Sequence, residues 1–311
     1  MHKRSSVIVR IFSLFNFGEI ILKIAIILPM KVAFFEALED ILQSTSFTQI
    51  REKFVPFYDD VKRGCVDFTS NICVRPSSDL ESLWIMHDNN TSALKIRRPN
   101  HAKSKLALAK ILHSVTHIEA SAIILALDAC YRFRDMPLAF YMDWLSVADE
   151  ELKHFGLLEE LLGELDSVYG AFPVHSTLFE AMQATQTSLE WRMGVVHRGL
   201  EAKGLDANPF VLQKLMQTNL PLKSKITEVF EIILRDEVGH VQKGDIWWRY
   251  AQKDMLTPQP FVTLCERFEH FSLAGRILNV DARLQAGFSI MELESLRTFY
   301  AKQSKRRLSR K

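Results

Sequence analysis

The chain has 311 residues, of which 48% are hydrophobic and 24% charged, a composition typical of a soluble globular protein with one large or two modest domains. Its 39 basic and 37 acidic residues leave a net charge of +2, which argues against a polyanion as the partner of the whole chain. Four scattered cysteines, Cys65, Cys73, Cys130 and Cys265, form no Cys-x-x-Cys pattern, which argues against a zinc ribbon or dithiol centre and favours a reducing cytoplasm.

Residues 1–29 differ from the rest of the chain, because a basic start is followed by a strongly apolar run. Arg10, Glu19 and Lys23 interrupt this run, and each charge would be costly at the middle of a membrane. We therefore expect synthesis to begin at Met30 and residues 1–29 to be an over-extended reading frame. Association of this segment with a membrane is the alternative.

Residues 30–96 are expected to form a helical lead-in and a loop. Apolar residues recur at helical spacing over 32–42, and a second helix is predicted over 48–62, with Pro56 as a kink or break. Gly64, Pro76 and several Ser and Asn residues then predict a loop that carries no recognisable chemistry.

The main domain is predicted over residues 97–256, and its first helix over Lys103–Arg132. Glu119 lies within the apolar stripe of this helix, where an unpaired carboxylate would cost several kcal/mol. It is therefore either half of a core salt bridge or a metal ligand. His113 and His117 on the same helix are left out of the site, because a satisfied or exposed histidine is the simpler explanation.

Two further helices carry the same short motif. Glu151 and His154 lie in the helix predicted over Leu138–Leu165, and Glu237 and His240 lie in the one over Leu222–Ala251. Residues three apart share a helix face, so each Glu-x-x-His presents a carboxylate and an imidazole together.

The third helix is predicted over Leu178–Lys203, with Gly204 as its C-terminal glycine and a short helix, Phe210–Gln217, beyond it. Its candidate ligands are Glu190, His197 and Glu201. Glu119 precedes Glu151 by 32 residues and Glu201 precedes Glu237 by 36, whereas Glu190 lies 47 before Glu237. The matching intervals of the two hairpins favour Glu201.

This pattern predicts a four-helix bundle that holds two metal ions, since such bundles take one Glu from each of two helices and a Glu-x-x-His from each of the others. Four carboxylates and two neutral imidazoles balance two divalent cations, and this donor set suits two iron ions, with manganese as the alternative. Glu150 and Asp236 precede ligand glutamates, and we expect one or both to hydrogen-bond a ligand imidazole across the bundle. The predicted ligands are Glu119, Glu151, His154, Glu201, Glu237 and His240.

Residues 257–303 are predicted to contain closing helices, over Pro258–Leu273 and Met291–Lys302. Residues 304–311 form a basic tail that we expect to be solvated and disordered, with contact to RNA or acidic lipid as an alternative.

The pattern of the four helices resembles the ferritin-like di-iron carboxylate superfamily. Several phrases further resemble an uncharacterised bacterial ferritin-like family, and the similarity spans roughly residues 97–253. The resemblance implies an all-α fold, a ferritin-like four-helix bundle with additional N-terminal and C-terminal helices, and a di-metal centre, but no particular reaction. The phrases are His117-Ile118-Glu119, Tyr169-Gly170-Ala171-Phe172-Pro173, Leu200-Glu201-Ala202-Lys203-Gly204-Leu205-Asp206 and Asp236-Glu237-Val238-Gly239-His240-Val241.

Three functions remain open at this stage. The first is an oxidoreductase of monooxygenase type, which would need molecular oxygen, an electron donor and an unknown small-molecule or macromolecular substrate. The second is a ferroxidase or iron-handling protein, and the third a non-catalytic bundle whose acids pair with basic residues. A radical-generating subunit is disfavoured, because Phe155-Gly156-Leu157-Leu158 stands where a tyrosine would be needed. The sequence leaves a homodimer open.

Overall fold

The computed structural model describes residues 31–80, 99–252 and 260–308. The segment 1–29 and the choice of Met30 as the start lie outside these residues. The fold is all-α, as predicted, and a single pair of two-residue parallel strands is the β-structure among the residues described. The lead-in consists of β1 (Val32–Ala33), α2 (Phe34–Leu42), α3 (Phe47–Lys62), β2 (Val66–Asp67) and η1 (Ser77–Leu80).

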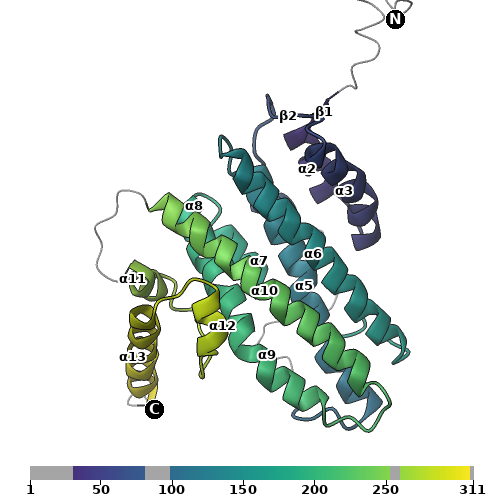
Figure 1. The fold of residues 1–311 in the computed structure, drawn as a ribbon, viewed down its shortest axis with the longest axis vertical. Coiled ribbons are helices and arrows are strands. Elements are labelled where there is room, and N and C mark those ends of the chain that lie inside the picture. The colour runs from purple at the N-terminus through teal and green to yellow at the C-terminus, as the bar shows by residue number, and fades with distance from the viewer. Residues whose placement is uncertain (1–30, 81–98, 253–259, 309–311) are drawn as a thin grey trace, which may run out of the picture.

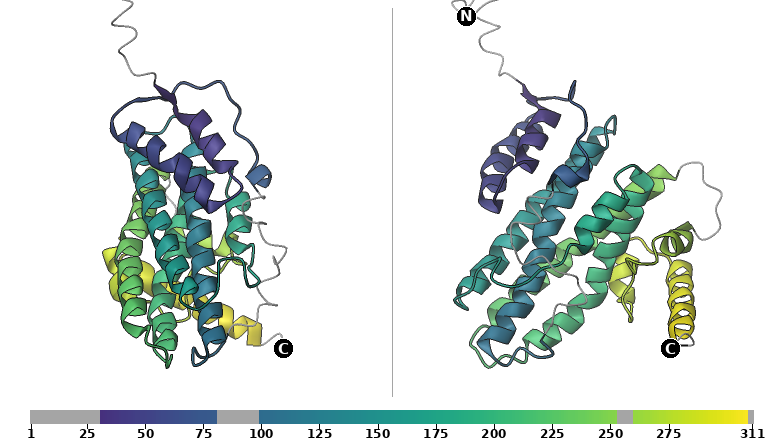
Figure 2. Two further views of the ribbon diagram at one scale, coloured as in Figure 1. Left: turned by 90° about the vertical axis from the view of Figure 1, so that its right-hand side faces the viewer. Right: turned by 180° about the vertical axis from the view of Figure 1, so that it is seen from behind.

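Four long helical stretches run side by side in the centre of the molecule (Figures 1 and 2). Helix α5 packs along α6, and α10 packs against α6 on one side and against η2 and α9 on the other. Helix α2 covers α5, and α3 covers α6. The central elements are α5 (Lys105–Arg132), α6 (Leu138–Gly163), α7 (Thr177–Ala184), α8 (Leu189–Trp191), η2 (Arg192–Leu200), α9 (Glu201–Leu215) and α10 (Lys223–Ala251).

Local chemistry explains where the central helices begin. The Ser104 hydroxyl accepts a hydrogen bond from the Ala107 amide, so it caps the first turn of α5. Pro137 directly precedes α6, where its missing N–H costs nothing. Helix α5 is long and apolar enough to cross a membrane, but 83% of its most apolar window is buried within the protein. Packing against the other helices therefore accounts for its apolar character.

The C-terminal helices pack beside η2, α9 and α10 (Figure 1). Buried ion pairs attach them: Arg283 donates to both carboxylate oxygens of Asp206 at 2.8 and 2.7 Å, and Arg198 contacts Glu292 at 2.7 Å. The elements are α11 (Pro260–Arg267), α12 (Val280–Gln285) and α13 (Ile290–Leu308). Helix α12 was not predicted, and α13 continues to Leu308, into the segment expected to be a disordered tail.

The third helix, predicted over Leu178–Lys203, begins where expected, because α7 starts at Thr177, but it is interrupted and its predicted end was wrong. The chain turns at residues 185–188 and then forms a π-helical stretch, η2, that passes directly into α9. Helix α9 continues through Gly204 and Pro209, so Gly204 does not end it and Phe210–Gln217 is not a separate helix. The buried side chain of Leu205 and the Asp206–Arg283 pair hold this region helical, which outweighs the local preference of glycine. Pro56 likewise lies inside α3 without ending it.

Candidate metal centre

The predicted ligands come from four different helical elements. Helix α5 supplies Glu119, α6 supplies Glu151 and His154, the first residue of α9 is Glu201, and α10 supplies Glu237 and His240. These residues lie where two apolar clusters of the bundle meet, one centred on the first half of α5 and α10 and the other on their second half. The polar layer is thus enclosed by hydrophobic packing on both sides.

Four of these residues form a tight, largely buried group. The ligand atoms of Glu119, Glu151, His154 and Glu237 all lie within 4.8 Å of one another. Nδ1 of His154 is 3.2 Å from Oε2 of Glu119 and 3.4 Å from Oε2 of Glu151. One metal ion could be held by this group, since it offers both oxygen and nitrogen donors from three helices.

His240 lies next to this group. Its Nδ1 is 3.0 Å from Oε1 of Glu151 and 3.6 Å from Oε1 of Glu237, so Glu151 stands between the two histidines. Within the described residues, both oxygens of Glu151 and Nδ1 of His240 are buried without a hydrogen bond. Buried polar atoms normally have a hydrogen-bond partner, so a cation bound between these atoms explains the arrangement better than hydrogen bonds among them do.

Glu201 is not part of the tight group. Its Oε1 is 2.8 Å from Nδ1 of His197, while its Oε2 is buried and makes no hydrogen bond to any residue that the structure describes. Burial and then the nearby charge of Glu237 raise the pKa of Glu201 well above its usual value. The other candidate, Glu190, lies away from the site and accepts a hydrogen bond from Gln252.

Two carboxylates outside the cluster, the outer acids Asp236 and Glu150, each contact the histidine of the opposite helix. Oδ2 of Asp236, on α10, is 3.1 Å from Nε2 of His154, on α6. Oε2 of Glu150, on α6, is 2.6 Å from Nε2 of His240, on α10. Each histidine therefore turns Nδ1 toward the cluster and can donate its Nε2 proton to an acid of the opposite helix, which fixes both the tautomer and the ring orientation.

The cluster carries a strong excess of negative charge. Burial, followed by the charge of Glu151, raises the pKa of Glu119 to about 7. Burial alone would lower the pKa of His154, but its contacts with Glu119 and Glu151 outweigh burial and raise the pKa to about 11. The acids therefore hold positive charge at the imidazoles, and bound cations would replace those protons.

Buried acids elsewhere in the described chain are neutralised differently. Asp128 pairs with Arg192 at 2.5 Å, and Asp245 pairs with Arg198 at 2.5 Å. By contrast, no Lys or Arg among the described residues forms an ion pair with any of the four glutamates predicted as ligands: Glu119, Glu151, Glu201 and Glu237. Within the described chain, the ion-pair partners of these acids are therefore histidines, which can also serve as metal ligands, and not the Lys or Arg of a core salt bridge.

His197 was weighed as a ligand but its contact with Glu201 was not predicted. Its position four residues before Glu201 on a helical segment is the signal that could have shown it. The indole of Trp144 packs on its ring, with centroids 3.9 Å apart. His113 and His117, left out of the site, lie away from the cluster and contact the segment around Tyr169 and His175.

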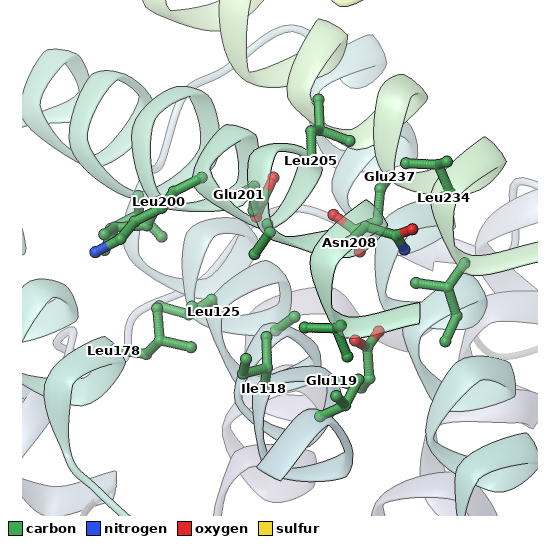
Figure 3. A pocket seen from close by; sticks show the side chains of 18 of the residues that line it. Ile118, Glu119, Leu125, Leu178, Leu200, Glu201, Leu205, Asn208, Leu234 and Glu237 are labelled. Atoms are coloured by element: carbon green, nitrogen blue, oxygen red, sulfur yellow. The ribbon is translucent and has the colours of Figure 1, made fainter. Parts of the chain in front are cut away.

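A pocket of about 280 Å³ ends at the cluster (Figure 3). Glu119, Glu201 and Glu237 line one part of it, and the other walls are mostly aliphatic side chains of α5, α7, η2, α9 and α10. Glu151, His154 and His240 do not line it. The cluster is therefore reached from the side of the carboxylates, opposite to the outer acids.

Comparison with known proteins gives two matches. A sequence model of the family described as "Protein of unknown function (DUF455)" matches residues 81–294. An uncharacterized protein of Haemophilus influenzae is 40% identical over 195 residues, which cover 60% of this chain and 66% of that protein, slightly less than two thirds of its length. No solved structure matches the chain.

Proposed function

The chain belongs to the DUF455 family of proteins of unknown function, and from its buried Glu/His cluster we propose that it is a dinuclear metal protein, with two iron ions, that uses molecular oxygen to oxidise a substrate. The observation that carries this proposal is the group of Glu119, Glu151, His154 and Glu237, whose ligand atoms lie within 4.8 Å of one another in the core. The arrangement also supports a ferritin-like bundle as the fold.

The donor set fits a pair of divalent ions. Glu119 with His154 would hold one ion and Glu237 with His240 the other, and Glu151, which lies between the two histidines, would be a further ligand of the pair. Glu201, with an unpaired buried oxygen, would complete the set at the pocket. Manganese could occupy the same donors.

Iron, when bound, would supply the redox chemistry with oxygen, and the protein's own residues supply its surroundings. Asp236 and Glu150 orient the imidazoles. The apolar clusters on either side keep bulk water from the acids, and an electron donor would be needed for each turnover.

The apolar pocket favours oxidation of an organic substrate over iron handling. A path for hydrated iron ions would need polar groups along its length, because shedding water without replacement ligands is costly. The walls beyond Glu119, Glu201 and Glu237 are instead mostly aliphatic.

Metal analysis of protein purified without chelator, followed by oxygen uptake after reduction, tests the proposal. We expect about two iron ions per chain in the wild type and a clear loss in Glu151→Gln, with Glu160→Gln on the exposed side of α6 as the matched control. Uptake that depends on an added organic compound supports the oxidoreductase, whereas uptake in fixed proportion to iron supports a ferroxidase. Metal-free wild-type protein that stays metal-free when ferrous iron is supplied would overturn the proposal.

A further inference from the structure

The pocket beside the cluster has a chemistry that selects its ligand. Of its lining residues, Ile118 and Ala122 come from α5, Leu178 from α7, Leu200 from η2 and Ile233 from α10. Figure 3 shows Leu125, Leu178 and Leu200 gathered at one side of the pocket, with Glu201 and Glu237 at the other. The pocket is therefore a mostly hydrocarbon-lined space that ends on carboxylates, and its other polar lining residues are His175, Thr177, Lys203 and Asn208.

We propose that this pocket binds an uncharged, mostly hydrocarbon small molecule, which is the class of substrate of the metal centre; this step rests on the proposed function. The exposed fraction of Ile118 is 46%, although it lies on the mostly buried helix α5, because its side chain faces the pocket. Covering such a surface with a hydrocarbon releases water and stabilises the complex in proportion to the apolar area that is buried.

The charge of the residues at the inner end of the pocket disfavours an anionic ligand. In the metal-free protein, an anionic ligand would have to place its charge next to Glu119, Glu201 and Glu237, whereas the lysine among the lining residues, Lys203, contacts the carbonyl oxygen of Phe271 at 3.4 Å. A buried charge without a partner costs far more than the apolar walls return. The metal-free pocket therefore discriminates an alcohol or hydrocarbon from a carboxylate of the same chain length.

Binding of an uncharged fluorescent probe, N-phenyl-1-naphthylamine, to the full-length metal-free protein tests the pocket directly. We expect one probe per chain, displaced by 1-octanol at least about tenfold more effectively than by octanoate. Equal displacement by the two competitors, or no saturable binding, would overturn the proposal.

Two pairs of variants locate the bound probe. Gly204 lines the pocket and Gly163 does not, and a Cβ added at either would meet no atom within 4 Å, so Gly204→Trp and Gly163→Trp should both fold. Likewise Ile118 and Leu106 are both exposed on α5, but only Ile118 lines the pocket. Gly204→Trp and Ile118→Asp should weaken probe binding at least about tenfold, whereas Gly163→Trp and Leu106→Asp should not change it. Equal affinities in all four variants would contradict the location.

Metal loading distinguishes the proposed substrate class from the proposed metal centre. If the pocket ends at the metal centre, Co²⁺ bound there should shorten the fluorescence lifetime of the bound probe, and Zn²⁺ should not. Probe binding in a protein that takes up no metal would refute the substrate assignment and the metal centre together while leaving a hydrophobic site. Metal uptake without probe binding would refute the substrate class alone.

Discussion

Replacing Asp236 by Asn should weaken metal binding, because it removes the charged partner of a ligand imidazole. Asp236 is 3.1 Å from Nε2 of His154 and its side chain is 12% exposed. Burial opposes its ionisation, but the hydrogen bonds from Arg235 and His154 outweigh burial and lower its pKa, so it is charged at neutral pH. The charge makes the imidazole a stronger donor to a metal ion.

The expected loss follows from the behaviour of such outer contacts, which are typically worth 10–100-fold in metal affinity, or about 1.4–2.8 kcal/mol. Glu150 makes the equivalent contact with His240 at the shorter distance of 2.6 Å, but its side chain is 38% exposed. Water can replace a partly exposed acid more easily than a buried one. We therefore expect Asp236→Asn to lie at the upper end of this range and Glu150→Gln at the lower end.

Competition with a chromophoric chelator on metal-free protein measures these affinities. Because the two acids contact different histidines, each variant should weaken one of two binding steps, and the double variant should weaken both. Glu231→Gln, on the exposed side of α10, is the control and should bind like the wild type. Wild-type affinity in Asp236→Asn would refute the role of this contact in orienting His154.

Further outcomes follow from the packing. Asp128→Asn should lower the free energy of unfolding by about 3–5 kcal/mol in urea titrations, because Arg192 would stay buried without its charged partner; a loss below 1 kcal/mol would contradict this. Burial opposes ionisation of Asp128 but Arg192 lowers its pKa, so its contribution should be complete above pH 4 and be lost as the pH falls through the lowered pKa. Gly244→Ala should destabilise the fold by about 1–3 kcal/mol, since its Cβ would lie 2.6 Å from the backbone carbon of His197. Gly239→Ala has open space around its Cβ and should stabilise the fold by up to about 1 kcal/mol. Thermal unfolding of the two variants tests both expectations. Removal of bound metal with a chelator should lower the melting temperature, and added Fe²⁺ or Mn²⁺ should raise it again with the logarithm of the metal concentration above the dissociation constant.

Because the Glu-x-x-His motif occurs twice, much of the arrangement of the candidate ligands could be predicted from the sequence. Glu151 with His154 and Glu237 with His240 each need only one helical turn to face the same way, and the similar intervals to Glu119 and Glu201 follow from helix length. The all-α fold is confirmed, and the structure brings Glu119, Glu151, His154 and Glu237 into one group. Their role as metal ligands stays a prediction.

Contacts between distant parts of the chain account for what the sequence did not predict. The helix through Gly204 depends on the pair that Asp206 forms with Arg283, 77 residues away. Helix α12, with six residues, is too short for hydrophobic periodicity to show, and its position is fixed by the same pair. The turn before η2 ends at Ser188, whose hydroxyl accepts a hydrogen bond from the amide of Trp191. This turn contains no glycine or proline, so a search for those residues does not find it.

The π-helical stretch η2 has a consequence for how the chain can vary. Its wider turns let Arg192 face Asp128 on α5 while Glu201, directly after the stretch, faces the cluster. In a regular α-helix, each residue advances the direction of a side chain by about 100°, so the two orientations would be locked together. Deletion of a single residue within η2 would therefore turn either Arg192 away from Asp128 or Glu201 away from the cluster. Most substitutions within η2 would instead leave the angle between these two side chains unchanged.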